Sequence, residues 1–223
     1  MSRPSGGRFG IILAAGTGSR FRGLKQFARL GGQPLFRFSV SAFERCPTVD
    51  GYVLVVCATR LNWTRRLVGR WRLKRLIAVV SGGRLRAESV DSGLRSLPEA
   101  GWVAIHDAAR PFITPAMLKQ GFAACQRHRA ATFGLPLTDT LKQIHGDRVV
   151  RTIDRSSLAT VQTPQFFELA LIRKAHAQRG QRPATDDCTL VETLGIRPVL
   201  LPGTTRNLKV TTRTDLELCA ALL

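Results

Sequence analysis

Two glycines and a group of cations follow the first apolar segment of the chain. The stretch GIILAAGTGSRFRGLKQF, residues 10–27, ends its apolar run at Ala14 and Ala15 and continues with Gly16 and Gly18. Glycines at such a turn let a phosphate approach the main chain, and successive N–H groups there form an anion-binding concavity. The cations that follow, with no acid among them, are Arg20, Arg22 and Lys25. The stretch therefore predicts a phosphate-binding loop.

This loop matches neither of two common phosphate-binding motifs. A dinucleotide fingerprint requires a third glycine where Phe21 stands, and a Walker A loop requires Gly-Lys followed by Ser or Thr. A glycine pair alone is often only a tight turn. The prediction therefore depends on the position of the loop after a strand and on the cations behind it.

An aspartate follows another apolar run. Asp107 stands just past the predicted strand at residues 103–106, where a parallel sheet presents its ligands. A carboxylate there can hold a Mg²⁺ that bridges triphosphate oxygens, since Mg²⁺ prefers one or two carboxylates plus phosphates. The alternative is an aspartate that caps a helix near Pro111. We interpret the neighbouring His106 as a packed core residue without a catalytic role.

A Gly-Gly pair follows a third apolar run. Gly82 and Gly83 allow the backbone to lie against a flat base, with Ser89 a few residues further on. The alternative is an ordinary turn between a strand and a helix, with Ser89 in the first turns of that helix.

Strands and helices that would position these residues alternate along the chain. Short apolar runs predict buried strands at residues 9–14, 52–56, 76–80, 103–106 and 132–135. Helical patterns lie between them at residues 34–45, 87–97 and 115–128. This order predicts a Rossmann-like α/β fold, with a mostly parallel sheet and helices on both faces.

The pattern changes at about Pro136. Residues 137–160 contain a turn signal at Gly146-Asp147 between two half-polar runs, which predicts an inserted β-arm. Helical patterns resume near Glu168 and at residues 186–194, followed by a strand at 198–201 and a helix at 214–222. Without a repeat or a composition break, the chain is interpreted as a single domain, 1–223, with an arm at about 137–160.

Composition bounds the compartment and the partners. No apolar run approaches the roughly 18 residues of a membrane span, and the N-terminus does not resemble a signal peptide. Five scattered cysteines without a CxxC pair favour reduced thiols and a cytoplasmic location.

The charge is strongly positive, because 34 Lys and Arg against 15 Asp and Glu give +19. The densest cluster of cations, residues 60–75, also contains two tryptophans, a combination that binds nucleic acid in some proteins. We favour the alternative, a helix with a solvated cationic face, and therefore do not expect a nucleic-acid partner. Its apolar stripe would comprise Leu61, Leu67, Val68, Trp71 and Leu76.

Several motifs together resemble one family. LAAGTGSR followed by LKQF is similar to the signature of nucleotidyltransferases that attach a nucleoside monophosphate to a phosphorylated small molecule. Further stretches narrow the resemblance: GGRLRAES, IHDAARP, LTDTLK with TIDRSSL and TPQFF, and NLKVT. In this order and spacing the chain, from about residue 10 to its end, resembles the 2-C-methyl-D-erythritol 4-phosphate cytidylyltransferases of the non-mevalonate isoprenoid pathway.

The resemblance implies a reaction and a set of residues. CTP and 2-C-methyl-D-erythritol 4-phosphate would give 4-diphosphocytidyl-2-C-methyl-D-erythritol and pyrophosphate, with Mg²⁺ as the cofactor and Asp107 as its ligand. The implied catalytic residues are Arg20, Lys25 and Lys209. The implied nucleotide-binding residues are Ala14, Ala15, Gly16, Gly18, Gly82, Gly83, Ser89, Asp107 and Ala108. The implied residues for the second substrate are Asp107, Arg110, Thr140, Arg155, Thr163 and Lys209.

The resemblance also implies a homodimer. Thr140 and Arg155 lie on the arm, which in the family crosses to the site of the neighbouring subunit. The chain departs from the family at Arg84 and Arg206, where an acid is usual, and at Leu13 and Leu24, where proline is usual. A cytidylyltransferase for another polyol phosphate, such as ribitol 5-phosphate, is the alternative function.

Overall fold

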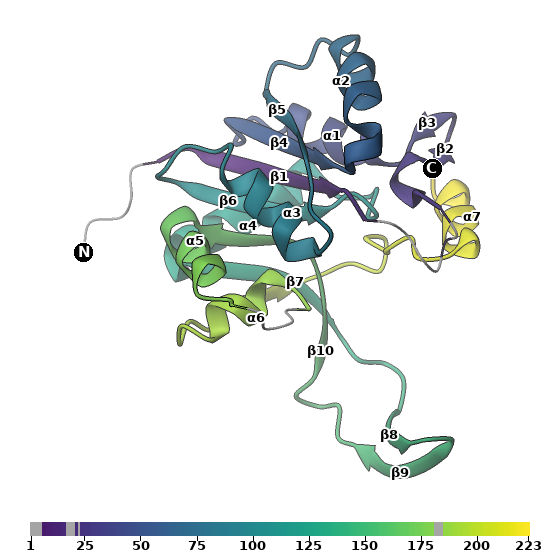
Figure 1. Ribbon diagram of the computed structural model, residues 1–223. Coiled ribbons are helices and arrows are strands. Elements are labelled where there is room, and N and C mark those ends of the chain that lie inside the picture. Colours follow the sequence, from purple (N-terminus) through teal and green to yellow (C-terminus); the bar gives the residue numbers. More distant parts are fainter. Residues whose placement is uncertain (1–5, 17–20, 22, 181–184) are drawn as a thin grey trace.

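A twisted seven-stranded sheet runs through the centre of the molecule in the computed structural model (Figure 1). The structure describes residues 6–16, 21, 23–180 and 185–223, so the predicted site residues Gly18 and Arg20 lie outside the described part. The strand order is β11-β7-β10-β6-β1-β4-β5. The strands are β1 (Arg8–Ala14), β4 (Gly51–Val56), β5 (Leu76–Ser81), β6 (Trp102–Asp107), β7 (Ala130–Pro136), β10 (Ala159–Glu168) and β11 (Val199–Pro202).

The sheet is parallel except at one strand. β10 runs antiparallel to both of its neighbours, β6 and β7, and every other neighbouring pair in the sheet is parallel. The predicted mostly parallel α/β fold is therefore confirmed. The sequence did not predict β10. Its polar residues and Pro164 hide the pattern of a strand, and its register with β7 shifts between Gln162 and Gln165.

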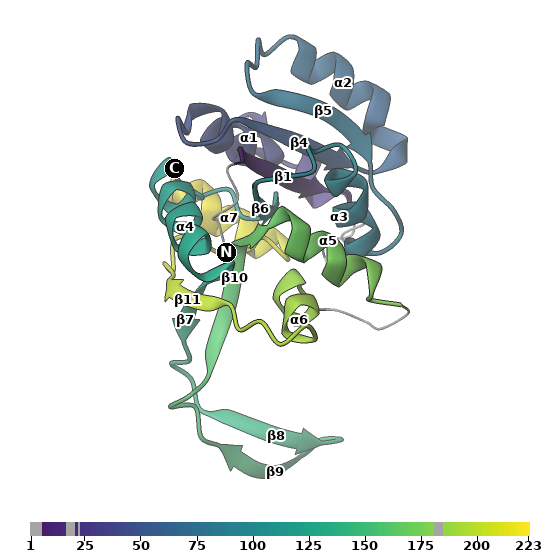
Figure 2. The same cartoon turned by 90° about the vertical axis from the view of Figure 1, so that its left-hand side faces the viewer.

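Helices cover both faces of the sheet, as predicted (Figures 1 and 2). Neighbouring residues of β1 show this, because Ile12 packs in one buried cluster with α1, α2 and α4, whereas Ile11 packs in a second cluster with α3, α5 and α6. The helices are α1 (Phe36–Arg45), α2 (Leu61–Gly69), α3 (Arg86–Leu94), α4 (Pro115–His128), α5 (Leu169–Ala177), α6 (Asp187–Glu192) and α7 (Arg213–Ala221). The helix predicted at 87–97 thus ends three residues early.

Short elements connect these layers. A third cluster, built on Leu30, Leu35, Val210 and Cys219, joins the segment after β1 to α7. Other short elements of the body are the 3₁₀ turns η2 (Lys25–Phe27) and η3 (Ala58–Arg60) and the small strands β2 (Arg29–Leu30) and β3 (Gln33–Pro34). No helix in the described part of the chain combines the length and apolar character that a membrane crossing needs.

The cationic segment at residues 60–75 folds as an amphipathic helix and its exit. Val68 is buried, and the rest of the predicted stripe, Leu61, Leu67, Trp71 and Leu76, packs partly buried against the core. Only residues 61–69 are helical, so Trp71 and Leu76 contribute from the turn after α2 and from β5.

The inserted arm projects from the body (Figures 1 and 2). β8 (Leu141–His145) and β9 (Arg148–Ile153) form an antiparallel hairpin at the far ends of β7 and β10. Its turn falls at the predicted Gly146-Asp147, and Gly146 has φ +60°, a conformation that favours glycine. All hairpin residues except Ile153 are exposed.

Candidate active site

A cavity of about 260 Å³ lies beyond the carboxyl ends of β1, β5 and β6. This is the edge of the sheet where parallel strands present ligand-binding loops. Its described lining is Leu13, Ala15, Gly16, Phe21, Lys25, Gln26, Gly83, Arg84, Leu85, Arg86, Ser89, Asp107, Ala109, Lys209 and Thr211. The cavity thus gathers segments that are far apart in the sequence.

Close packing explains the glycine that ends β5. A Cβ added to Gly82 would stand 2.5 Å from Ala15 Cβ and 2.6 Å from Ser89 Oγ, so no larger residue fits there. The N–H of Gly82 donates to Val56 O at 2.8 Å and continues the sheet ladder. Gly82 therefore brings the loop after β1 and the start of α3 together, while Gly83 lines the cavity.

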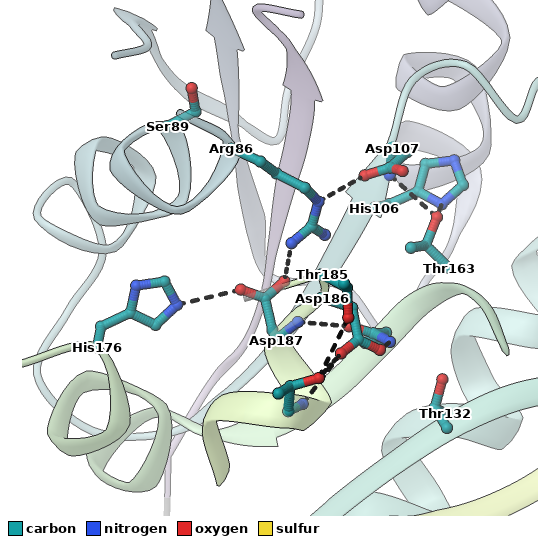
Figure 3. Close-up of polar contacts among 12 residues, drawn as sticks. Arg86, Ser89, His106, Asp107, Thr132, Thr163, His176, Thr185, Asp186 and Asp187 are labelled. Atoms are coloured by element: carbon teal, nitrogen blue, oxygen red, sulfur yellow. Dashed lines mark hydrogen bonds and ion pairs between the residues drawn. The ribbon is translucent and has the colours of Figure 1, made fainter. Parts of the chain in front are cut away.

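Asp107 is a carboxylate that lines the cavity, and Figure 3 shows its contact with Arg86. Arg86 Nε donates to its Oδ1 at 3.2 Å, and Lys209 Nζ donates to its Oδ2 at 2.7 Å. Burial alone would raise the pKa of Asp107, but the charges of Arg86 and Lys209 outweigh burial and hold that pKa well below its usual range. Asp107 does not cap a helix, because α4 begins at Pro115 with Thr114 as its cap.

A buried pair fixes the backbone that carries Asp107. The Asp107 N–H donates to Thr163 Oγ1 at 3.1 Å, and this hydroxyl lies 3.2 Å from His106 Nδ1. His106 Nε2 lies 3.1 Å from Arg110 O. Burial lowers the pKa of His106 to about 4, so the ring is neutral and the residue packs in the core as predicted.

The segment before Lys209 is held by a buried asparagine. Asn207 donates through Nδ2 to Thr163 O at 2.9 Å. Its backbone carbonyl oxygen accepts a hydrogen bond from Arg110 Nη1 at 2.6 Å. Next in the chain, Val210 N–H donates to Ala109 O at 2.8 Å. These bonds place Lys209 against Asp107 from the C-terminal side. Of the two nearby arginines, Arg86 contacts the carboxylate of Asp107, whereas Arg110 donates to the backbone of Asn207.

Nearly the whole chain is similar to the proteins of one known family. Residues 9–223 match the family model described as 2-C-methyl-D-erythritol 4-phosphate cytidylyltransferase. The chain belongs to the 2-C-methyl-D-erythritol 4-phosphate cytidylyltransferase family. Membership confirms the resemblance drawn from the motifs and, with it, the nucleotidyltransferase class.

Individual members of the family align with nearly the whole chain. The cytidylyltransferase of Geobacillus thermodenitrificans is 43% identical over 218 residues, covering 96% of this chain and 95% of that protein. That of Dehalococcoides mccartyi is 40% identical over 215 residues, covering 96% and 94%. The crystal structure of 4-diphosphocytidyl-2C-methyl-D-erythritol synthase from Anaerococcus prevotii superposes with a TM-score of 0.85 at 25% identity, covering 97% of this chain and 95% of that one.

The cavity collects part of the residue set that the family resemblance implied. The implied residues that line it are Ala15, Gly16, Lys25, Gly83, Ser89, Asp107 and Lys209. Five others, Ala14, Gly82, Ala108, Arg110 and Thr163, are not among the described lining residues and stand next to it in the chain or the hydrogen-bond network. Thr140 and Arg155 are exposed on the arm. Arg84, where the family has an acid, lines the cavity, whereas Arg206 does not.

Sequence reasoning missed a second carboxylate that contacts Arg86. Asp187, at the start of α6, accepts a bond from Arg86 Nη1 at 2.7 Å and is 1% exposed (Figure 3). Its other oxygen lies 3.1 Å from His176 Nε2. Arg86 stood within the motif GGRLRAES without a role, and the only sequence signal for Asp187 was the pair of acids that opens a helix.

The residues around Asp107 fit a magnesium ion that is held mostly by a nucleotide. The described part of the chain contains no group of three or more His, Cys, Asp or Glu side chains arranged to hold a metal ion. Asp107 instead offers a single carboxylate at the wall of a cavity lined by Lys25 and Lys209. One carboxylate with phosphate oxygens is a common set of ligands for Mg²⁺, and a poor one for a metal bound by protein alone.

Proposed function

We propose that this protein transfers the cytidylyl group of CTP to 2-C-methyl-D-erythritol 4-phosphate and releases pyrophosphate. The observation that carries the proposal is the meeting of the glycine segments, Asp107 and the cations Lys25 and Lys209 in one cavity of a chain of this family. Cations facing one carboxylate suit a reaction between two anions, because the charge they must stabilise is negative.

The chemistry needs no strong general base. An oxygen of the substrate phosphate, already an anion, forms a bond to the α-phosphorus of CTP, and the bond from that phosphorus to the bridging oxygen of pyrophosphate breaks. Negative charge increases at the α-phosphate and on the leaving group, where Lys25 and Lys209 stabilise it. Arg20, outside the described residues, is proposed to act with them. Mg²⁺ held by Asp107 would neutralise and orient the triphosphate.

Backbone and small side chains are proposed to bind the nucleotide. Gly83 leaves room for a flat base beside Ser89, whose hydroxyl donates to Leu85 O at 3.2 Å within the start of α3. Gly16 lines the cavity from the loop after β1, where its backbone would contact the triphosphate. Behind them Ala14, Gly82 and Ala108 keep the strand ends closely packed, and Ala14 and Ala108 are fully buried.

The second substrate is proposed to lie between two subunits. Arg110 and Thr163 would act near Asp107, while Thr140 and Arg155 would reach it from a neighbour, since both lie on the projecting arm, on either side of its hairpin (Figures 1 and 2). The arm supports a homodimer because it exposes apolar side chains that a partner would bury: Ile144 (65%), Val149 (61%) and Val150 (58%). An arginine such as Arg155 suits a bidentate grip on phosphate.

We further propose that the enzyme works in the cytoplasm without a membrane or nucleic-acid partner. All five cysteines are free thiols, as a reducing compartment favours. The apolar side of the cationic segment packs on the core, which accounts for Trp71 and the leucine residues without a nucleic acid. Trp63 is 38% exposed and packs edge-on against Phe27.

Pyrophosphate release across a panel of substrates tests the function. Each of four NTPs is combined, with Mg²⁺, with 2-C-methyl-D-erythritol 4-phosphate and separately with ribitol 5-phosphate. We expect release only with CTP and the erythritol phosphate. Release with another NTP would contradict the proposed choice of CTP, and release only with ribitol 5-phosphate would contradict the proposed second substrate. An Asp107→Asn protein serves as the inactive control.

A further inference from the structure

A continuous line of paired charges runs from the cavity into the protein (Figure 3). Arg86 bridges two carboxylates, with Nε on Asp107 Oδ1 at 3.2 Å and Nη1 on Asp187 Oδ2 at 2.7 Å. Asp187 continues to His176 Nε2 at 3.1 Å, and His176 Nδ1 lies 2.8 Å from Asp91 Oδ1. One guanidinium therefore connects the site carboxylate with a buried anion that is not in the cavity.

The position of Asp187 is fixed by several elements. Gln165 of β10 accepts the Asp187 N–H through Oε1 at 3.1 Å and donates through Nε2 to Asp186 Oδ2 at 2.6 Å. Asp186 in turn caps α6 by accepting the Thr189 N–H at 3.0 Å. Asp187 is thus held from β10, α5 and the start of α6, which makes its carboxylate a rigid anchor.

This anchor has a consequence for the site because a metal on Asp107 must compete with the cations already there. Arg86 and Lys209 each contact one oxygen of Asp107. A guanidinium that also pairs with a second carboxylate neutralises the first carboxylate less. Without Asp187, Arg86 would be free to leave its bridging position and to pair with Asp107 alone.

We propose that Asp187 is a positioning residue that holds Arg86 so that Asp107 keeps the charge and geometry to bind a magnesium–nucleotide complex. Asp187 touches neither substrate nor metal, and it acts through Arg86. The inference rests on the proposed function, and specifically on the magnesium ligand Asp107.

The test measures magnesium binding as well as turnover. Asp187→Asn keeps the size of the side chain and removes its charge. Calorimetric titration of Mg²⁺ into the full-length protein with CTP gives the half-saturating Mg²⁺ concentration. We expect it to rise about tenfold, within the range of coupling for one ion-pair network. The matched control is Glu192→Gln, which removes an exposed carboxylate at the other end of α6 and should leave the value unchanged.

A second variant separates position from net charge and covers a failure of Asp187→Asn to fold. Arg86→Lys keeps the charge, but a point-like ammonium cannot bridge two carboxylates as a planar guanidinium does. We expect the same rise in the magnesium requirement, with kcat at saturating Mg²⁺ falling less than kcat/KM at low Mg²⁺. In an Arg86→Lys background, adding Asp187→Asn should change the magnesium requirement less than twofold, because Asp187 acts through Arg86.

The outcomes are distinct. A folded Asp187→Asn protein with the wild-type magnesium requirement overturns the inference while leaving the proposed function intact, as does a full additional effect of Asp187→Asn on top of Arg86→Lys. An equal rise in Glu192→Gln would reduce the effect to general charge and overturn it as well. Wild-type protein that binds CTP without any dependence on Mg²⁺ would overturn the magnesium proposal and this inference together.

Discussion

We propose two roles for the single residues of the cavity. Some keep the carboxylate of Asp107 ionised and oriented, and others stabilise the negative charge that develops during the reaction. Asp107 is already paired with Arg86 and Lys209, so its carboxylate stays ionised and oriented before any substrate arrives. Lys25 comes from a different segment, the 3₁₀ turn after β1, and lines the cavity from there. We propose that Lys25 and Lys209, which line the cavity from different segments of the chain, each stabilise part of the developing charge.

Replacing Lys25 tests this division. Lys25→Ala should lower kcat by about 100- to 1000-fold, the usual cost of removing one preorganised charge that acts on the transition state. The dissociation constant for CTP should change only a few-fold, because the contact strengthens mainly at the transition state. Single-turnover kinetics and equilibrium binding measure the two effects. Lys119→Ala, an exposed lysine of α4, is the control, and near-normal turnover of Lys25→Ala would remove Lys25 from catalysis.

His176 should make stability depend on pH. Burial lowers its pKa, but the bonds and charges of Asp187 and Asp91 outweigh burial and raise it above the ordinary value. The groups that face it are Asp187 of α6 and Asp91 of α3, with Arg179 paired to Asp91 beyond. Since the folded pKa is raised, the protonated ring stabilises the fold fully below the unfolded pKa of about 6.5, and this stabilisation is lost as the pH rises through the folded pKa.

Urea unfolding of the wild type and of His176→Gln checks that dependence. The difference between their free energies of unfolding should favour the wild type most at pH 6 and shrink steadily toward pH 9. A difference that stays constant over this range, or that grows with pH, would show that His176 is neutral in the folded protein.

The sequence predicted the cavity residues that belong to local patterns and missed those that depend on long-range contact. The glycines and Asp107 follow apolar runs, so their place at strand ends could be read from the chain. The partnership of Arg86 with Asp187 joins positions 101 residues apart, and no local pattern encodes it. Thr163 was expected to bind the second substrate. In the structure its hydroxyl accepts a hydrogen bond from the Asp107 backbone N–H, at the point where the register between β10 and β7 shifts.

At the scale of elements, α4 and β10 approach each other closely at a glycine of α4. Gly121 of α4 lies against Phe166 of β10, and a Cβ built on Gly121 would stand 2.1 Å from the ring. Phe166 is fully buried and packs edge-on against Phe122 at 5.1 Å, so the ring has little room to move. This packing holds β10 beside β6, and β10 carries both Thr163 and Gln165 toward the site.

Gly121→Ala therefore sets two effects against each other. Helix propensity alone would favour alanine by about 1 kcal/mol. Overpacking against Phe166 should win and lower the free energy of unfolding by about 1–3 kcal/mol. Gly69→Ala is the matched control, because nothing lies within 4 Å of a Cβ at the end of α2, and it should be neutral or stabilising. Chemical denaturation measures both, and a stabilised Gly121→Ala protein would contradict the packing argument.

The element pattern explains which parts of the fold were predictable. Parallel strands buried on both faces give continuous apolar runs, as in β1, β4 and β6, and their positions followed from the chain. β10 interrupts its apolar residues with glutamine, threonine and proline, and the side chains of Thr163 and Gln165 form hydrogen bonds to Asp107 and to Asp186. The strand that was hardest to predict is thus one that supports the site.

At the scale of the whole molecule, we propose that the arm of one chain completes the cavity of a second copy. The arm of each chain projects away from its own body, and its residues Thr140 and Arg155 are exposed (Figure 2). The apolar side chains on the hairpin are costly to leave in water, which favours their burial against a second copy. A symmetric pair would then bring the arm of each subunit to the body of the other.

Mixed dimers test this arrangement directly. Lys25→Ala damages the body and Arg155→Ala damages the arm, so each protein alone should be nearly inactive. A dimer with one chain of each kind contains one site with an intact body and an intact arm. Equal mixing after dissociation should therefore restore about a quarter of the wild-type activity, because about half of the dimers are mixed and each has one working site. Lys25→Ala mixed with Lys209→Ala is the matched control and should restore nothing, since both changes lie on the body. If tagged chains show that mixed dimers have formed and the first pairing stays inactive, each site is built from a single chain and the arm serves another purpose.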